Sequence, residues 1–175
     1  MVRAEGPLPL GPSPDAATVV FVRPSAFGAA IHPTIFDERG HFLGDAEASS
    51  HFVVRVPPGE HMFVVWAENT GPIRAWLAPG RTYFVEVAMK PGWWHARAHL
   101  LAITPRTGSW GHLRDWLADT KPTLTNLHAG QDYLDGRSED VAERLRRARE
   151  ALAEMDAEEL EERTLRPNDG LADAM

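Results

Sequence analysis

Two proline-glycine turns divide the middle of this 175-residue chain into short apolar runs, and this punctuation constrains the fold more than any other feature. The turns are Pro57-Pro58-Gly59 and Pro79-Gly80, both within residues 52–87. Proline fixes φ and lacks a donor, whereas glycine accepts positive φ, so each turn ends a strand. The runs between them are rich in Val, Phe, Trp and Tyr, which suit a pleated, half-buried surface. The segment therefore predicts consecutive antiparallel strands and no helix.

The same pattern continues on both sides of these turns and predicts eight or so short strands. We expect them at residues 18–23, 30–37, 41–44, 49–56, 62–67, 73–77, 82–89 and 94–103. Strands at this spacing are typical of two packed sheets. We therefore predict a mainly β fold, an antiparallel β-sandwich of the immunoglobulin- or transthyretin-like kind with a C-terminal α-helical extension. Alternation predicts that seven side chains point inward: Val20, Val22, Phe52, Val54, Val64, Trp66 and Phe84.

Composition divides the chain into five segments. Residues 1–16 are rich in proline and are expected to form a flexible leader, followed by the sandwich at residues 17–106. A short helix and linker are expected at residues 107–136. A long, charged amphipathic helix should occupy residues 137–166, before a frayed tail at residues 167–175.

A family resemblance is carried by four stretches of the predicted sandwich. They are Val19-Val20-Phe21-Val22-Arg23-Pro24, the hairpin from Ile35-Phe36-Asp37 to Leu43-Gly44, Val56-Pro57-Pro58-Gly59-Glu60-His61, and Leu77-Ala78-Pro79-Gly80-Arg81-Thr82-Tyr83-Phe84-Val85. In order and spacing, residues 17–105 resemble the bacterial domain of unknown function 2846. The resemblance implies a β-sandwich and, because members are often short envelope lipoproteins, a place in the cell envelope. It implies no established activity, cofactor or catalytic residues.

Composition excludes several classes of function. The chain has no cysteine, which excludes disulfides, thiolate nucleophiles, zinc-thiolate sites and lipid attachment through cysteine. Its net charge of −7 arises entirely in residues 107–175, and an acidic balance argues against nucleic acid as a partner. No apolar run approaches the ~18 residues of a membrane span. The beginning of the chain lacks a signal peptide, so the sequence as it stands predicts a cytoplasmic protein, or an envelope protein if an export signal was removed.

Eight histidines invite a metal-site interpretation, which their spacing does not favour. His95 and His99 would lie ~13 Å apart on a strand, too far to share one ion. Ser49-Ser50-His51 places a hydroxyl beside an imidazole, but neighbouring strand residues point to opposite faces. We predict no metal site, no cofactor and no catalytic residue. A metal-dependent enzyme that uses the histidines remains the alternative from another class.

The long helix carries the best candidate for a partner surface. Its apolar stripe consists of Val141, Leu145, Ala148, Leu152 and Met155. This narrow stripe is typical of a coiled-coil seam, but it spans about two heptads, whereas a stable dimer needs ~3–4. The stripe must be buried on this chain's own sandwich or short helix, on a second copy in a weak homo-oligomer, or on another protein. Packing within the chain is the favoured of these three.

Four tryptophans form a candidate aromatic patch. Trp93 and Trp94 are adjacent on an expected strand, so both cannot face the core, and Trp110 and Trp116 lie on the expected short helix. An exposed cluster would bind a peptide, a glycan or a protein. Burial between the sandwich and the short helix is the simpler interpretation.

Taken together, these patterns predict a non-enzymatic module that binds or scaffolds. Its helical extension would pack against the sandwich or meet a protein partner. A self-associating structural subunit is the second alternative beside the metal-dependent enzyme. Nothing in the sequence specifies a ligand.

Overall fold

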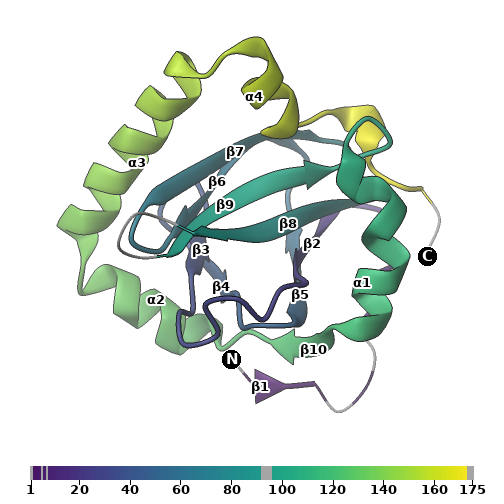
Figure 1. Cartoon of the computed structure of the whole chain (residues 1–175), viewed down its shortest axis with the longest axis horizontal. Coiled ribbons are helices and arrows are strands. Elements are labelled where there is room, and N and C mark those ends of the chain that lie inside the picture. The colour runs from purple at the N-terminus through teal and green to yellow at the C-terminus, as the bar shows by residue number, and fades with distance from the viewer. Residues whose placement is uncertain (1, 5, 7, 92–95, 173–175) are drawn as a thin grey trace.

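The computed structural model describes residues 2–4, 6, 8–91 and 96–172. Two β-sheets pack face to face at its centre, and helices cover their outer faces (Figure 1). The prediction of a mainly β fold is confirmed, since 40% of the chain is strand and 29% is helix.

One sheet has six strands and the other has five. The six-stranded sheet has the order β1 (Val2–Arg3), β10 (Lys121–Leu124), β5 (Ser50–Val56), β2 (Ala17–Arg23), β8 (Arg81–Pro91) and β9 (Ala96–Ile103). The five-stranded sheet has the order β11 (Thr164–Leu165), β7 (Thr70–Leu77), β6 (Gly59–Trp66), β3 (Thr34–Phe36) and β4 (Phe42–Asp45). Strands β2 to β9 lie close to the eight expected segments, and among the residues described between 17 and 103 no helix interrupts them.

The prediction of purely antiparallel sheets was wrong, because both sheets are mixed. Strand β2 runs parallel to β8, β10 runs parallel to β5, and β11 runs parallel to β7. Period-two alternation determines which face a side chain takes, but it carries no information about the direction of the neighbouring strand. Parallel neighbours also need a long connection, and here five strands, β3 to β7, separate β2 from β8 in the chain.

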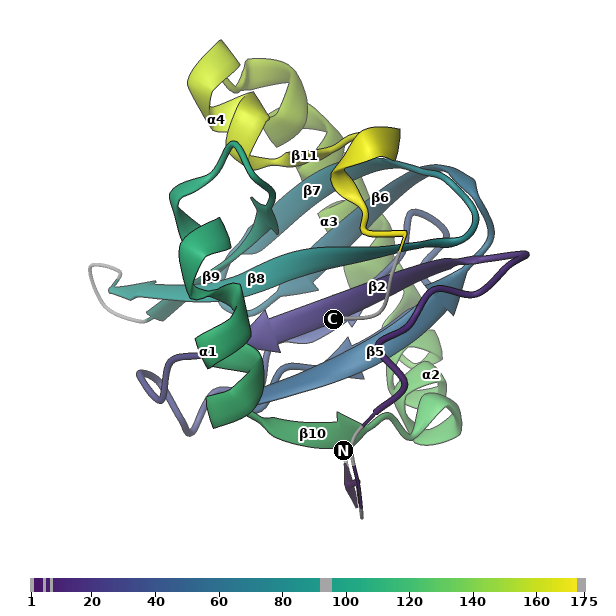
Figure 2. The same cartoon turned by 90° about the vertical axis from the view of Figure 1, so that its right-hand side faces the viewer.

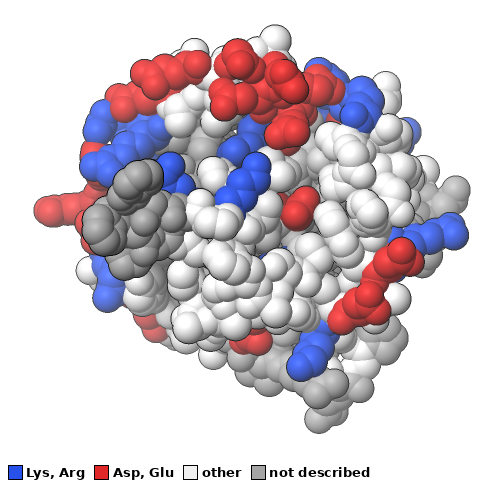
Figure 3. All heavy atoms as spheres, in the orientation of Figure 1, with Lys and Arg blue, Asp and Glu red and all other residues white. Residues whose placement is uncertain are grey.

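Helices cover the sheets from both sides (Figure 2). The 3₁₀ helix η1 (Gly108–His112) and α1 (Leu113–Asp119) lie against the six-stranded sheet. Helices α2 (Leu127–Asp135) and α3 (Ser138–Glu154) lie against the five-stranded sheet. The chain ends with α4 (Ala157–Glu162), β11 and the 3₁₀ helix η2 (Pro167–Asp169). Acidic side chains gather over α4 (Figure 3), where the run from Glu158 to Glu162 lies.

This layering produces three apolar clusters. The main core between the sheets includes Val19, Phe21, Phe52, Phe63, Tyr83 and Leu100. A second cluster lies between the five-stranded sheet and helices α2 and α3, and includes Phe36, Val64, Leu134, Val141 and Ala148. A third lies under η1 and α1, and includes Val20, Val22, Phe84, Ile103 and Leu113.

The predicted inward set is therefore split between faces. Phe52 lies in the main core and Val54 packs against it. Val20, Val22 and Phe84 instead face α1, while Val64 and Trp66 face α2 and α3. Both faces of the central strands are covered, so both alternating sets are apolar, and the pattern cannot tell which set meets the other sheet.

The single long helix expected at residues 137–166 is two helices. Met155 has an extended ψ of 138° and ends α3. Asp156 then caps α4, its Oδ1 accepting bonds of 2.9 Å from the backbone nitrogens of Glu158 and Glu159. An aspartate that caps a new helix competes with helix continuation, which accounts for the break.

The terminal segments are more ordered than expected. Thr82 and Leu171 exchange backbone hydrogen bonds of 2.8 and 2.9 Å, so the expected frayed tail lies along β8 as far as Leu171. In the expected leader, the carbonyl of Leu10 accepts a 2.8 Å bond from Thr82 Oγ1. The expected linker before α3 contains β10 and α2.

A buried arginine holds the loop after β2. Arg23 is 1% exposed, and its guanidinium donates four hydrogen bonds of 2.7 to 2.9 Å to the carbonyl oxygens of Phe27, Gly28, Ile31 and Ala46. No described carboxylate pairs with it. One side chain therefore fixes the path of residues 24–33.

Helix α2 approaches β4 closely at a glycine. A Cβ built on Gly130 would overlap ring atoms of Phe42. Phe42 is 6% exposed and belongs to the cluster under α2 and α3. The absence of a side chain at residue 130 is therefore a condition of this packing.

Candidate functional site

An open cleft lies on the outer face of the β6–β7 hairpin, beside the C-terminal end of α3. Its volume is about 550 Å³, within the range of about 300–1,000 Å³ usual for small-molecule sites. Strands β6 and β7 supply its floor, and α3 supplies one wall through Arg149, Leu152 and Ala153. The cleft is therefore built by both the sheet and the helical extension.

Strand register determines which side chains reach the floor of the cleft. Glu60 pairs with Trp76 across the hairpin, and Met62 pairs with Arg74. Because side chains alternate along a strand, these four residues share the outer face. Met62 is 8% exposed and provides an apolar base, whereas Glu60 is exposed.

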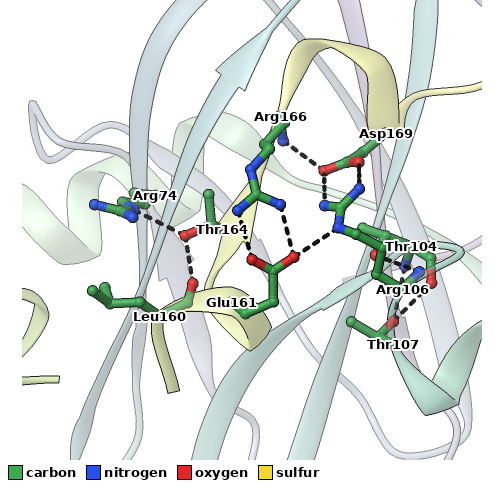
Figure 4. Close-up of polar contacts among 9 residues, drawn as sticks. All are labelled: Arg74, Thr104, Arg106, Thr107, Leu160, Glu161, Thr164, Arg166 and Asp169. Carbon is green, nitrogen blue, oxygen red and sulfur yellow. Dashed lines mark hydrogen bonds and ion pairs between the residues drawn. The ribbon is translucent and has the colours of Figure 1, made fainter. Parts of the chain in front are cut away.

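Trp76 connects the two charged residues of this floor without letting them pair. Its Nε1 donates a 2.7 Å hydrogen bond to Glu60 Oε1, and the Arg74 guanidinium lies 5.2 Å from the centre of its ring. Arg74 is oriented by its Nε, which donates a 2.9 Å bond to Thr164 Oγ1 (Figure 4). The indole, the carboxylate and the guanidinium therefore hold fixed orientations before any ligand arrives.

A second carboxylate and a histidine close the inner end of the cleft. His61 Nε2 lies 2.8 Å from the carbonyl oxygen of Pro57, and since a carbonyl only accepts, Nε2 carries a proton. Glu38 Oε2 accepts a 3.2 Å bond from the backbone nitrogen of Met62 and lies 3.5 Å from His61 Nδ1. That Nδ1 is buried without a hydrogen-bond partner, on a side chain that is 10% exposed. The Glu38 carboxylate therefore lies beside this ring nitrogen without a hydrogen bond between them.

A denser polar cluster lies at the C-terminal segment (Figure 4), and its side chains are paired with one another. Arg106 donates to both carboxylate oxygens of Asp169 at 2.5 and 2.8 Å, and its Nε donates to Glu161 at 2.6 Å. Arg166 donates twice to Glu161, and its backbone nitrogen donates to Asp169. Hydrogen bonds from Arg166 and Arg106 lower the pKa of Glu161 to about 2. The cluster holds the C-terminal segment to the end of β9 and leaves no carboxylate oxygen free for a ligand.

The histidines do not assemble into a metal centre within the described ranges, where no group of three or more His, Asp or Glu side chains is placed to hold an ion. His51 Nδ1 lies 2.8 Å from Thr120 Oγ1, and burial lowers the pKa of His51. His99 Nδ1 accepts a 3.0 Å bond from Arg163. Burial and then the charge of Arg163 lower the pKa of His99 to about 4. His95 lies outside the described residues.

The apolar stripe of α3 packs on this chain's own five-stranded sheet. Val141 is 7% exposed and Ala148 is fully buried, while Leu145 and Leu152 are half-buried against the same cluster. Met155, also half-buried, ends the helix. Arg144, which the sequence did not single out, donates to Asn69 and Thr70 at the β6–β7 turn. A partner on α3 would therefore meet its charged side and not the stripe.

The predicted aromatic patch is only partly visible. Trp93 and Trp94 lie outside the described residues. Trp110 and Trp116 are half-buried against Val20, Val22 and Phe84 on the outer face of the six-stranded sheet. Trp110 also lines a cleft of about 440 Å³ with Leu171, on the other sheet from the Trp76 cleft.

Sequence reasoning missed the residues that the hairpin brings together. Glu60 and Trp76 are 16 residues apart. Glu60 precedes the strand expected at residues 62–67, and Trp76 belongs to the strand expected at residues 73–77. Their proximity could have been inferred from the sequence. A hairpin centred on residue 68 pairs residue 60 with residue 76 and residue 62 with residue 74. Glu38 carries no such signal, because it comes from a different turn.

Comparison of the chain with protein-family models, with curated proteins and with solved structures finds no match. No helix in the described part of the chain has the length and apolar character needed to cross a membrane. The function must therefore be argued from the cleft itself.

Proposed function

We propose that this protein is a non-enzymatic binding module, and that the cleft on the β6–β7 hairpin is its ligand site. The observation that supports this most is the fixed platform of Trp76, with Glu60 on its ring nitrogen and Arg74 against its ring. A site whose groups are oriented in advance loses less entropy on binding than a flexible one. The volume of about 550 Å³ suits a small polar molecule or one unit of a larger one.

The helical extension would serve as a wall of this site. Arg149, Leu152 and Ala153 of α3 face the cleft, and α3 is held in place by its buried stripe and by Arg144. On this proposal the extension packs within the chain and shapes the site, and association with a protein partner is secondary.

Binding is favoured over catalysis by the arrangement of the cleft's candidate base. His61 is the histidine of the site, but its Nδ1 is buried beneath Glu38 and its Nε2 is engaged with Pro57. A general base must reach the proton that it removes. An imidazole enclosed in this way supports the structure more readily than it supports a reaction.

The finer fold and family assignments are also proposals. Two packed sheets and the order of the proline-glycine turns support a sandwich related to the domain of unknown function 2846. An immunoglobulin- or transthyretin-like subclass would have to include the parallel pair formed by β2 and β8.

A fragment screen tests the ligand site. Chemically varied fragments (neutral polyols, amines, carboxylates and aromatics) are titrated into ¹⁵N-labelled protein, and amide shifts are followed. The proposal expects shifts that cluster at residues 60–62 and 74–76 and that vanish in Trp76→Ala. Trp110→Ala is the matched control, because it removes an indole of η1 that packs against the other sheet. Shifts scattered over the surface, or none, would reject the proposal.

A further inference from the structure

The polar groups of the cleft leave both donors and acceptors unused. Glu60 Oε1 accepts from Trp76, so Oε2 remains available, and Glu60 itself is exposed. Arg74 uses Nε toward Thr164, which leaves its two Nη groups for a ligand. Arg149 forms no hydrogen bond or ion pair with a described residue. Donors and acceptors therefore line the same small space.

The charges of the cleft balance. Glu38 and Glu60 contribute two negative charges, and Arg74 and Arg149 contribute two positive charges. A balanced lining gives no net attraction for a cation or for an anion, since each is attracted by one pair of groups and repelled by the other. A neutral ligand with groups that both donate and accept fits this arrangement, and hydroxyl groups have that property.

The indole adds a flat apolar surface beside these groups. Trp76 is half-buried and held on its ring nitrogen by Glu60, so the orientation of its ring is fixed. Met62 and Leu152 extend the apolar surface. The Arg74 guanidinium lies over part of the indole ring, 5.2 Å from its centre. The remaining apolar surface, with polar groups beside it, matches a pyranose ring, which has apolar C–H faces and hydroxyls around its edge.

The inner end of the cleft points to the same chemistry. His61 is nine-tenths buried with an unpartnered Nδ1, and Glu38 lies over it with a side chain that is 27% exposed. Glu38 Oε2 accepts from the Met62 backbone nitrogen, and Oε1 lies 3.9 Å from Arg39 Nε, a contact too long for a hydrogen bond, so Oε1 can still accept from a ligand's donor. A hydroxyl group supplies such a donor without adding charge.

We infer that the cleft binds a neutral saccharide, with one sugar ring against Trp76 and its hydroxyls on Glu60, Arg74 and Glu38. This inference rests on the proposed ligand site and names its ligand class. Glu60 would accept hydrogen bonds from the hydroxyls of the ring, and Arg74 would donate hydrogen bonds to them.

The probes are methyl glycosides of glucose, galactose, mannose and N-acetylglucosamine, with their β1,4- and α1,4-linked disaccharides. They are titrated into the ¹⁵N-labelled full chain. We expect at least one to shift the Trp76 indole resonance, with affinity reduced at least tenfold in Trp76→Ala and in Glu60→Gln/Arg74→Gln. Trp110→Ala should bind as the native chain does. Circular dichroism and amide dispersion confirm that each variant is folded.

The outcomes separate this inference from the proposed function. If charged or aromatic fragments shift the cleft residues and no saccharide does, the ligand site stands and the saccharide inference is wrong. If saccharides bind equally to Trp76→Ala, the inference is wrong about the site. If no probe or fragment reaches the cleft, both are rejected.

Discussion

Arg106 donates hydrogen bonds from both terminal nitrogens to the carboxylate of Asp169, at 2.5 and 2.8 Å. Asp169 is 63 residues later in the chain and only 4% exposed, so this pair links the segment after β9 to the C-terminal segment. Asp169 Oδ2 also accepts a 2.7 Å bond from the backbone nitrogen of Arg166. The buried carboxylate thus accepts two charge-assisted hydrogen bonds from Arg106 and one bond from a backbone nitrogen. These bonds explain why the C-terminal segment packs against the sheet.

Replacing Asp169 with Ala should destabilise the protein. The change leaves Arg106 and the Arg166 backbone nitrogen without their partner, and because the Arg106 side chain is 41% exposed we expect a loss of about 2 kcal/mol. Urea denaturation measures it. Glu143→Ala, in the exposed ion pairs of α3, is the control and should leave the midpoint nearly unchanged. Equal effects of the two substitutions would contradict this account.

Stability should fall on mild acidification, with His99 as a contributor. The pKa of His99 is about 4 in the folded protein, against 6.5 for an unperturbed histidine side chain. The unfolded chain therefore binds more protons below pH 6.5, so stability is lost from that pH down to about 4 and no further below it. Burial lowers the pKa of His51 and adds a loss of the same sign.

Urea midpoints of the native chain and of His99→Gln, measured across this pH range, test the assignment. The variant should show a shallower fall, because glutamine does not titrate. An identical slope in both proteins would assign the acid sensitivity to other groups.

Gly130→Ala should destabilise the protein although alanine favours helices. The added Cβ would meet the Phe42 ring, which is buried and cannot easily move, so we expect a loss of about 1–3 kcal/mol. Gly111→Ala is the matched control, since nothing lies within 4 Å of its Cβ position, and it should be neutral or slightly stabilising. Thermal melts of both variants give the comparison. A stabilising Gly130→Ala would show that α2 lies farther from β4.

The double variant Leu145→Glu/Leu152→Glu tests the packing of α3. Both leucines lie against the cluster under the helix, so two carboxylates there should cost about 2–4 kcal/mol. The melting temperature should fall equally at all protein concentrations, because the contact is within one chain. Ala142→Glu places a charge at an exposed position and should change little. A loss that depends on concentration would indicate a second copy on the stripe.

Local patterns predicted the strands well and their arrangement poorly. Proline-glycine turns and alternation are properties of a few consecutive residues, so β5 to β8 could be located from the sequence. The parallel pairing of β2 with β8 depends on contacts between residues about 64 positions apart, such as Val20 and Phe84. No local period reports such a contact.

The candidate site had the same limitation. Trp76 was visible as a strand aromatic, but its importance comes from Glu60 across the hairpin, from Thr164 behind Arg74, and from α3 beside it. Of these contacts, only the one between Glu60 and Trp76 follows from the register of a hairpin. The stripe of α3 was recognised as needing burial, but the surface that covers it became identifiable only in the folded chain.

Arg23 holds the loop after β2 through the backbone of the loop. Three of the four carbonyl oxygens that accept from the guanidinium belong to this loop, those of Phe27, Gly28 and Ile31, and the Phe27 side chain is 49% exposed. Substitution at Phe27 therefore changes what the loop displays without removing a bond that shapes it. The side chain at residue 27 can thus vary without altering the path of the loop, provided that Arg23 is kept.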